Sequence, residues 1–389
     1  MTQQLCVMLV AAEASGDDRG ARLARALRQR LGQGVRFVGT GGEKLAAEGV
    51  ASPFNIAELS IVGVFEGLLA YRRVMRRVAD TAALAQRENP DVAVLIDSWG
   101  FTIRVARALR RAAPGLPLVK YVGPQVWAWR PGRARILASA VDHLLSINAV
   151  DPPYFAAAGL ATTFVGDATL ALDFTDADPA CLRAEIGASV EAPILLVLPG
   201  SRPGELNRML PPFLDAATIL LKARPDLEVV IAAAATIAED LRGRLSGASD
   251  RIHLIEGEEL KRAAMKAATV ALACSGTVTT ELALAGCPFV VGYRLGPMTH
   301  AVLKPLLRTR YITLVNIAAG QEIARERLQG ACTGPRLASD IAALLDDPAA
   351  RRCQVEAQNV ALSKMGRGGP NPSEAAADAI LAILEAREA

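Results

Sequence analysis

The chain has 389 residues, of which 51% are hydrophobic, 4% aromatic and 21% charged. Its length and apolar content provide enough surface for the cores of two or three domains, which excludes global disorder. Lys and Arg number 43 against 40 Asp and Glu, a net charge of +3. So balanced a charge excludes a protein that binds nucleic acid through bulk electrostatics.

Cysteine and histidine spacing bears on metals and on the cellular compartment. None of the six cysteines belongs to a Cys-x-x-Cys pair, and the three histidines are isolated. We therefore expect no zinc site, no disulfide framework and a reducing compartment. Residues 1–10 have neither a charged segment nor a cleavage site, and no apolar run reaches the roughly 18 residues of a membrane span. The sequence predicts a cytoplasmic protein that is soluble or peripheral to a membrane.

The first half of the chain alternates short apolar runs with helical patterns. Strands are predicted at residues 5–11, 36–38, 92–96, 118–122, 144–147 and 163–165. After the first strand, Ser15 is placed to cap a helix in which Leu23, Leu27 and Leu31 share one face. Continuous apolar strands separated by helices predict a parallel sheet that is covered on both faces.

The second half repeats this arrangement after a change of pattern. Residues 173–193 are acidic, Ala-rich and without a strand pattern, and we interpret them as the connection between two domains. Further strands are predicted at residues 194–198, 228–234, 251–255, 270–274 and 289–292, and a C-terminal helix at 374–387. The predicted fold class is α/β, with two doubly wound Rossmann-like halves. Ligands of such folds bind at the carboxyl ends of strands, here in the cleft between the halves.

Two loops in the second half carry residue types that hold phosphate groups. One ends a predicted strand at residues 198–202, and the other ends a later strand and opens a helix at residues 274–281. Backbone amides, hydroxyls and a guanidinium in such loops can bind a pyrophosphate, and a carboxylate one turn on can accept hydrogen bonds from ribose. The candidate nucleotide-binding residues are Gly200, Ser201, Arg202, Glu205, Ser275, Gly276, Thr277 and Glu281.

The common nucleotide and hydrolase motifs are missing from the sequence. It has no Walker-type phosphate loop, no Gly-x-Ser-x-Gly elbow and no complete dinucleotide-binding glycine pattern, of which residues 39–42 are only a fragment. A nucleotide would therefore be held by the two loops described above, without a Walker lysine.

Three segments of the first half are candidate sites for a sugar and for its chemistry. Residues 13–17, with Glu13, Ser15 and Gly16, form either a loop that cradles a sugar or phosphate or a plain strand-to-helix turn. Asp97 ends a strand and is either a general base or a helix cap.

The third of these segments, residues 121–130, places two tryptophans beside Gly, Pro and Gln. Aromatic faces stack on sugar rings and amide side chains bond to their hydroxyls, so Gln125 and Trp127 are candidate sugar contacts. The alternative is a loop that the aromatic rings merely anchor in the core.

Two apolar and basic segments bear on membrane contact. Residues 61–79 and 300–314 mix Leu, Val, Phe and Tyr with Arg and Lys. Helices of this composition either lie on an anionic membrane surface or are ordinary amphipathic core helices.

Taken together and in order, these blocks resemble the lipid-A-disaccharide synthase family, which are bacterial glycosyltransferases of the GT-B architecture. The resemblance covers nearly the whole chain. The most specific blocks are residues 121–130 and 275–281. The others are residues 13–17, 37–42, 59–66, 96–97, 164–166, 198–202 with Glu205, 290–294 and 314–316 with Glu322.

The resemblance implies an inverting reaction that uses no metal and no cofactor. UDP-2,3-diacylglucosamine would donate its sugar to the 6-hydroxyl of 2,3-diacylglucosamine 1-phosphate, giving a β-1,6-linked disaccharide 1-phosphate and UDP. Asp97 matches the family's proposed base. Arg202, Ser275, Thr277 and Glu281 match positions around UDP, and Asn316 and Gln329 lie in a matching block near the cleft.

The resemblance also implies roles for the domains and a place in the cell. Residues 1–172 would bind the acceptor and carry the base, and residues 173–368 would bind the UDP-sugar. Residues 369–389 would form a helix that packs on the first half or on a second subunit, so a homo-oligomer stays open. The acylated substrates imply peripheral association with the inner face of the inner membrane.

The chain departs from the family pattern near the expected site. The family usually has Gly where Ala12 stands, Pro and Asp where Trp99 and Gly100 stand, and His where Asp167 stands. These changes leave two alternatives open. One is a paralogous UDP-sugar transferase or epimerase, and the other is a nucleotide-sugar-binding or lipid-binding protein without catalysis.

Overall fold

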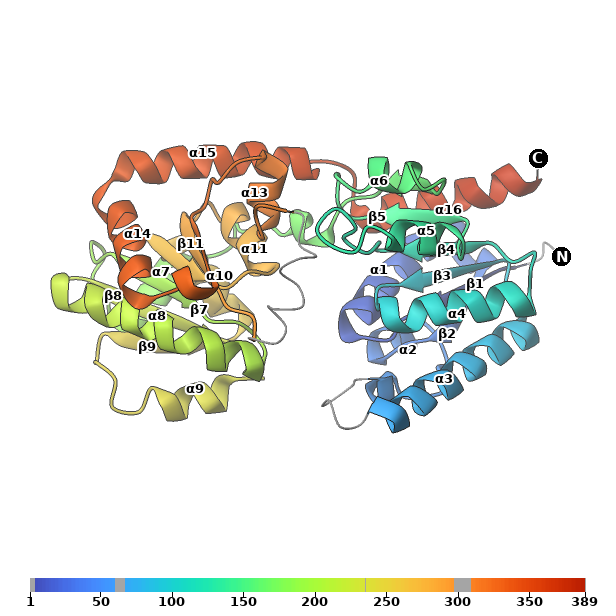
Figure 1. Ribbon diagram of the computed structural model, residues 1–389, viewed down its shortest axis with the longest axis horizontal. Coiled ribbons are helices and arrows are strands. Elements are labelled where there is room, and N and C mark those ends of the chain that lie inside the picture. The colour runs from blue at the N-terminus through green and yellow to red at the C-terminus, as the bar shows by residue number, and fades with distance from the viewer. Residues whose placement is uncertain (1–3, 60–66, 235, 297–308, 389) are drawn as a thin grey trace. The chain divides into compact units, whose positions relative to one another are not determined.

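The chain folds into two compact units, which a computed structural model describes for residues 4–59, 67–234, 236–296 and 309–388 (Figure 1). Unit 1 comprises Met1–Ala168 and Gly369–Ala389, and unit 2 comprises Thr169–Gly368. The basic, apolar segments 61–79 and 300–314 lie partly outside the described residues. No helix in the described part of the chain is long and apolar enough to cross a bilayer.

Unit 1 is built on a parallel sheet of six strands in the order β2-β1-β3-β4-β5-β6. The strand order reverses between β1 and β3, and in such sheets ligands bind at the carboxyl ends of the two strands that flank the reversal. Residues 13–17 follow β1 and Asp97 follows β3. The strands are β1 (Leu5–Val10), β2 (Val35–Thr40), β3 (Val92–Ile96), β4 (Leu118–Tyr121), β5 (His143–Ser146) and β6 (Ala161–Phe164).

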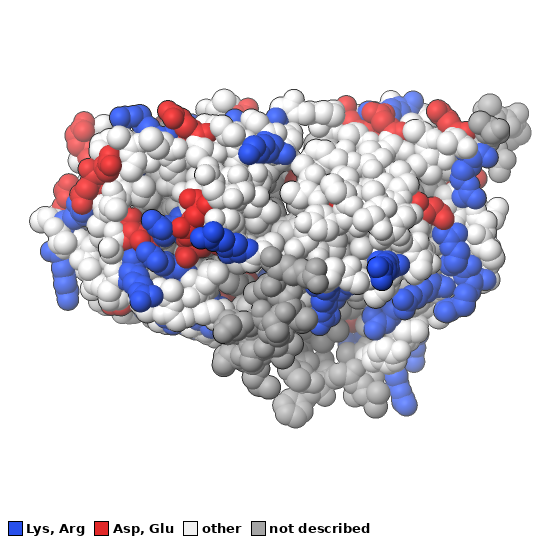
Figure 2. Space-filling view, turned by 45° about the horizontal axis from the view of Figure 1, so that its top comes forward, with Lys and Arg blue, Asp and Glu red and all other residues white. Residues whose placement is uncertain are grey.

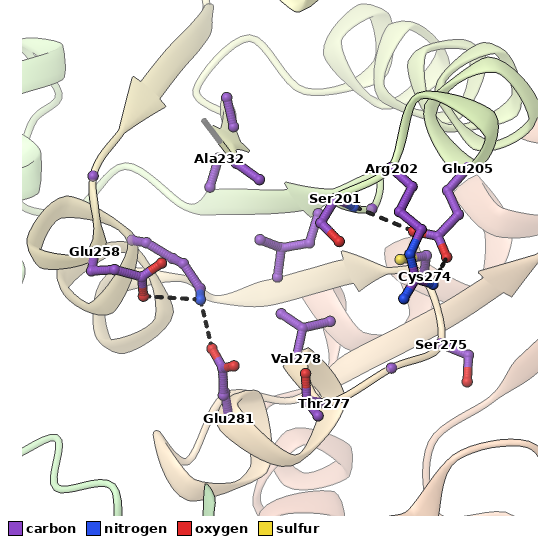
Figure 3. Close-up of a pocket in the computed structure, with 17 residues that line it drawn as sticks. Ser201, Arg202, Glu205, Ala232, Glu258, Cys274, Ser275, Thr277, Val278 and Glu281 are labelled. Atoms are coloured by element: carbon purple, nitrogen blue, oxygen red, sulfur yellow. Dashed lines mark hydrogen bonds and ion pairs between the residues drawn. The ribbon is translucent and has the colours of Figure 1, made fainter. Parts of the chain in front are cut away.

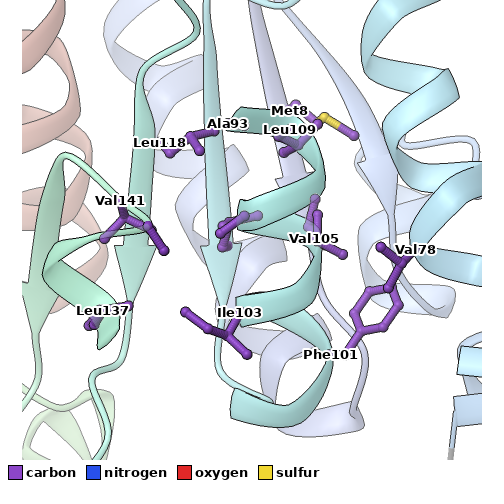
Figure 4. Packing of buried hydrophobic residues seen from close by; sticks show 14 of the residues in the cluster. Met8, Val78, Ala93, Phe101, Ile103, Val105, Leu109, Leu118, Leu137 and Val141 are labelled. Carbon is purple, nitrogen blue, oxygen red and sulfur yellow. The ribbon is translucent and has the colours of Figure 1, made fainter. Parts of the chain in front are cut away.

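Helices cover both faces of the unit 1 sheet, which explains why its central strands are apolar throughout. Met8 and Ala93 pack beneath α3 and α4 (Figure 4), whereas Val7 and Leu9 pack beneath α1 and α16. The helices of unit 1 are α1 (Ala14–Leu31), α2 (Glu43–Ala47), α3 (Gly67–Glu88), α4 (Trp99–Ala112), α5 (Arg133–Ala138), α6 (Pro152–Ala156) and α16 (Pro372–Glu388).

Unit 2 has a second parallel sheet of six strands, in the order β12-β11-β10-β7-β8-β9. Its strand order reverses between β7 and β10, whose carboxyl ends lead into the two predicted phosphate loops. The strands are β7 (Ile194–Leu198), β8 (Glu228–Ala233), β9 (Ile252–Glu256), β10 (Val270–Ala273), β11 (Phe289–Tyr293) and β12 (Glu326–Leu328).

The helices of unit 2 also pack on both faces of its sheet and bury two apolar clusters. They are α7 (Pro179–Ile186), α8 (Pro203–Ala223), α9 (Ala238–Arg244), α10 (Glu258–Ala267), α11 (Val278–Leu284), α13 (Leu314–Ala319), α14 (Gly334–Asp346) and α15 (Pro348–Met365).

The predicted fold class, two doubly wound α/β halves with parallel sheets, is confirmed. Three local predictions are incomplete or wrong. The stretch predicted only as a connection contains α7, and β12 was not predicted. Ser15 does not cap α1, because the helix begins at Ala14 and its N-cap is Glu13, which makes no side-chain capping bond.

Candidate functional site

A pocket of about 360 Å³ lies at the carboxyl edge of the unit 2 sheet (Figure 3). All of the candidate nucleotide-binding residues line it, although they come from two loops more than seventy residues apart. These residues are Gly200, Ser201, Arg202, Glu205, Ser275, Gly276, Thr277 and Glu281. The pocket is completed by residues 232–234 at the end of β8 and by residues at the start of α10.

The first loop is organised by Glu205 from the first turn of α8. Gly200 has φ +114°, and a Cβ there would lie 2.9 Å from the Glu205 side chain, so only glycine fits without strain. Glu205 Oε2 accepts a hydrogen bond from the Ser201 amide at 3.3 Å, and Oε1 lies 3.3 Å from Arg202 Nη1. The side chain of Arg202 is 80% exposed and is thus available to an anion.

A lysine that the sequence analysis did not single out supplies a second cation on the opposite side of the pocket. Lys261 Nζ lies 2.7 Å from Glu281 and 3.1 Å from Glu258, and Figure 3 shows both carboxylates on the side away from Arg202 and Glu205. Burial lowers the pKa of Lys261, but the charge of Glu281 and then of Glu258 outweighs it and raises this pKa above its ordinary value. Lys261 is therefore charged at neutral pH. In the sequence, the one indication of Lys261 is its position, one turn into the helix that follows β9.

The second loop turns from β10 into α11. Thr277 is the N-cap residue of α11, and the hydroxyl of Thr279 donates to the Gly276 carbonyl at 2.8 Å. The Ser275 hydroxyl donates to the Ile312 carbonyl at 3.3 Å. Hydrogen bonds within the loop and to Ile312 therefore hold it, and its Gly276 and Thr277 line the same pocket as Arg202.

In unit 1, Asp97 occupies a strained turn between β3 and α4. Asp97 and Ser98 have φ of 48° and 33°, a left-handed conformation that is costly for residues with a Cβ. The Asp97 side chain is 33% exposed. Its Oδ2 accepts a hydrogen bond from the Ser15 hydroxyl at 3.1 Å and lies 3.4 Å from Arg19 Nη1. The carboxylate is thus oriented from α1 while solvent still reaches it.

A buried lysine from the neighbouring strand lies beneath this turn. Lys120 is 2% exposed, and its Nζ donates to the Asp97 carbonyl oxygen and, at 2.9 Å, to the Thr102 hydroxyl. Burial lowers the pKa of Lys120 to about 7, although the charges of Asp97 and Glu13 oppose this change. Lys120 was not among the predicted site residues, and its one signal in the sequence is that it is a lone cation within an otherwise apolar strand.

The other candidates of the first loop lie beside Asp97. Gly16 is buried, and a Cβ there would meet the Asp97 Cβ at 3.6 Å, so α1 passes close to the turn. Glu13 is exposed at the start of α1. Arg19 also lies 3.9 Å from Asp167, one of the departures from the family pattern. One guanidinium therefore joins two carboxylates that follow different strands.

Two candidate sugar contacts are buried within the protein. Trp127 is 6% exposed and its Nε1 donates to Asp151 at 2.7 Å, so the ring is part of the core of unit 1. Asn316 is fully buried, and its amide bonds to Ala324 and Glu326 and accepts from two backbone amides. Because all of its polar atoms are engaged within unit 2, none is left for a sugar.

The two remaining candidates lie at the surface. Gln125 is exposed, and its backbone carbonyl accepts from the amides of Ala128 and Trp129. Gln329 is partly exposed after β12, with φ of 51°. Among the described residues, no cluster of three or more His, Cys, Asp or Glu side chains is suited to a metal ion.

Comparison with known proteins gives a family match along the chain. The family model described as lipid-A-disaccharide synthetase matches residues 7–380. A lipid-A-disaccharide synthase from Rhodospirillum centenum is 39% identical over 383 residues, covering 98% of this chain and 96% of that protein. One from Ruegeria pomeroyi is 40% identical over 384 residues, covering 96% and 94%.

Solved structures with the same fold are more distant in sequence. A Staphylococcus aureus MnaA structure with UDP has a TM-score of 0.66 at 14% identity, and 98% of this chain and 97% of that chain are covered. A UDP-GlcNAc 2-epimerase from Neisseria meningitidis, bound to UDP-GlcNAc, has a TM-score of 0.61 at 12% identity and covers 99% and 100%. These likenesses show the GT-B type of fold.

Proposed function

The chain belongs to the lipid-A-disaccharide synthase family, and from this premise we propose how its two units divide one glycosyl transfer. The enzyme is a hexosyltransferase of lipid A synthesis. It joins UDP-2,3-diacylglucosamine to 2,3-diacylglucosamine 1-phosphate and releases UDP. In our proposal unit 2 holds the UDP part of the donor, and unit 1 holds the acceptor and supplies the base.

The proposed UDP site is the pocket of unit 2. Its volume of about 360 Å³ falls in the range of small-ligand sites. Arg202 and Lys261 stand on opposite sides of it, and these two cations would offset the negative charge that grows on the diphosphate as it leaves. The loop amides around Gly200 and Gly276 would bind its oxygens, and Glu281 would accept from the ribose.

The proposed base is the Asp97 carboxylate. It would take the proton of the acceptor 6-hydroxyl while that oxygen bonds to the anomeric carbon of the donor. The bond from this carbon to the diphosphate breaks, its electron pair leaves with UDP, and the anomeric configuration inverts. Ser15 and Arg19 hold the carboxylate in place, and its 33% exposure leaves it open to an acceptor.

One observation carries the proposal. The residues that the sequence predicts for phosphate and ribose binding follow β7 and β10 and line one pocket. Lys261, which was not predicted, lines the same pocket. Independently, Asp97 lies after β3 with an oriented carboxylate at the reversal point of the unit 1 sheet. Each unit thus offers one of the two half-sites that a donor and an acceptor need.

We extend the proposal to the membrane surface. The exposed side of α3 combines apolar and basic side chains, and in Figure 2 Lys and Arg side chains gather at the right-hand edge, which belongs to unit 1. The exposed side of α3 would attract the anionic inner leaflet from which acylated substrates are drawn. The exposed residues are Tyr71, Arg72, Arg73, Met75 and Arg76.

The test of the proposed function is UDP release by the purified protein, without added metal, from UDP-2,3-diacylglucosamine. We expect release only when 2,3-diacylglucosamine 1-phosphate is present. Asp97→Asn keeps the size of the side chain but removes the base, so it should lower kcat by about 10²- to 10⁴-fold. Donor binding and the thermal melting curve should stay unchanged.

The matched control is Glu43→Gln, which neutralises an exposed carboxylate in the same unit and should keep full activity. Donor binding without acceptor-dependent release would contradict the proposal and indicate a binding protein. Conversion of the donor without any acceptor would indicate an epimerase.

A further inference from the structure

Two arginines and two tryptophans of unit 1 form a continuous stack next to the Asp97 turn. The guanidinium carbon of Arg130 lies 4.7 Å from the centre of the Trp129 ring, and that of Arg133 lies 4.7 Å from the same ring. Arg133 also lies 4.9 Å from the ring of Trp99. The order of the stack is therefore Arg130, Trp129, Arg133, Trp99. We call these four residues the Arg–Trp stack.

The Arg–Trp stack carries positive charge that no carboxylate in the described part of the chain neutralises. Within the described residues, neither Arg130 nor Arg133 takes part in a salt bridge or a side-chain hydrogen bond, whereas Arg25, Arg28 and Arg30 all pair with carboxylates. Burial, followed by the charge of Arg130, lowers the pKa of Arg133. Guanidinium groups stay protonated even so. Each of these two cations therefore remains available to an anion.

The stack is tied to the proposed base by the chain itself. Trp99 is the first residue of α4 and follows Asp97 by two positions. Contact with the Trp99 ring holds Arg133 beside the turn that carries the base. The UDP pocket of unit 2 has its own cations, Arg202 and Lys261, so the donor diphosphate needs no further charge from unit 1.

We propose that Arg130 and Arg133, held by the rings of Trp129 and Trp99, bind the phosphate monoester of the acceptor. This inference rests on the proposed function. The acceptor must place its 6-hydroxyl at Asp97, and its phosphate is on the opposite end of the same sugar ring. Guanidinium groups match phosphate oxygens in pairs, and aromatic faces fix their direction. In this chain Trp99, where the family usually has Pro, is part of the phosphate site.

The test compares two acceptors that differ only in the phosphate, at saturating donor, in nonionic micelles without phospholipid. We expect the native enzyme to prefer the phosphorylated acceptor. The double variant Arg130→Gln, Arg133→Gln should lower kcat/KM for that acceptor by about 100-fold, mainly through KM, because it removes two charge-assisted contacts. Its kcat/KM for the acceptor without phosphate should stay within about twofold of the native value, since that acceptor makes no use of the charges.

Two further variants separate binding from folding. Arg135→Gln removes an exposed charge from α5, the helix that also carries Arg133, and should leave kcat/KM for both acceptors unchanged. Trp99→Leu keeps both charges but removes one ring, and should raise KM for the phosphorylated acceptor alone. Melting curves of all variants show whether unit 1 remains folded.

The outcomes distinguish this inference from the proposed function. The proposed phosphate site would be overturned if the double variant lost kcat/KM equally for both acceptors or lost it for neither. It would also be overturned if the native enzyme did not prefer the phosphorylated acceptor. Calorimetric titration of the enzyme with the phosphorylated acceptor measures binding of this acceptor independently of turnover. If the native enzyme binds it but releases no UDP, the proposed transfer fails, while a loss of this binding in the double variant would still uphold the phosphate site.

Discussion

Asp97 shows how a single residue can be held in an unfavourable conformation. Two consecutive residues with positive φ cost of the order of 1–3 kcal/mol each, and such strain persists only where neighbouring groups enforce it. Here the enforcing group is Lys120, whose Nζ bonds to the Asp97 carbonyl and the Thr102 hydroxyl. Lys120 is therefore a positioning residue for the base, and its charge state should affect the stability of unit 1.

Lys120→Met tests this role through pH. The folded state releases the Lys120 proton at about pH 7, whereas the unfolded chain keeps it until about pH 10.5. Between these values the unfolded state binds more protons, so the free energy of unfolding rises with pH. As the pH rises through this range, we expect the free energy of unfolding of the native protein to increase relative to that of the Met variant by about 1 kcal/mol per pH unit.

All three tryptophans lie in unit 1, so urea unfolding followed by tryptophan fluorescence measures this unit alone. Burial raises the pKa of Cys6 to about 11 and that of Tyr121 to about 12, and because both variants keep these two groups of unit 1, their contribution cancels when native and variant proteins are compared. The control Arg111→Met removes an exposed charge from the same unit, and the stability difference it causes should not change with pH. A flat difference for Lys120→Met as well would mean that Lys120 keeps its proton in the folded state.

At the scale of elements, the sequence predicts best where burial is complete. The runs at residues 92–96 and 194–198 are apolar throughout because helices cover both faces, and the predicted bounds match β3 and β7. β12 is a three-residue edge strand, Glu-Arg-Leu, and has no apolar run to reveal it. α7 was missed because its pattern is short and weakly amphipathic, although Asp178 caps it and Pro179 begins it.

Burial also separates the candidate residues that line the pocket from those that lie in the core. Loops that follow strands could be found from Gly, Ser and Arg at strand ends, since the fold brings those ends to one edge. Whether a side chain points outward could not be read from composition, and Trp127 and Asn316 both point inward. Their partners, Asp151 and Glu326, are distant enough in sequence that no local pattern connects them.

Asn316→Ala tests the structural role of this side chain at the end of the unit 2 sheet. Its amide ties α13 to the segment that leads into β12, and its removal takes from the buried Ala324 the side-chain partner of both its amide and its carbonyl. We expect a loss of about 2–5 kcal/mol in the stability of unit 2, measured by calorimetry. KM for the donor should stay unchanged at temperatures where the variant is folded.

The matched control for this prediction is Gln321→Ala, an exposed amide in the same connection, which should have little effect. If Asn316→Ala instead raised KM with no loss of stability, the side chain would have to contact the substrate.

At the scale of the whole molecule, the two units are not consecutive along the chain. After α15 in unit 2 the chain returns to unit 1, where α16 packs against α1. Arg30 of α1 lies between two carboxylates of α16, Asp378 and Glu374. Unit 1 is therefore assembled from both ends of the chain, and its core cannot be complete until the last helix has been made.

Ile380→Asp tests this dependence. Ile380 is fully buried in the cluster that α16 shares with α1 and β1, and an unpaired carboxylate there loses its hydration without any partner. Undocking α16 should lower the urea midpoint of tryptophan fluorescence, which reads unit 1, and speed amide exchange in α1. The calorimetric transition of unit 2 should not move. Ala382→Asp places the same charge on the exposed side of α16 and should preserve both transitions. Equal losses in the two units would instead show that α16 stabilises the molecule as one cooperative body.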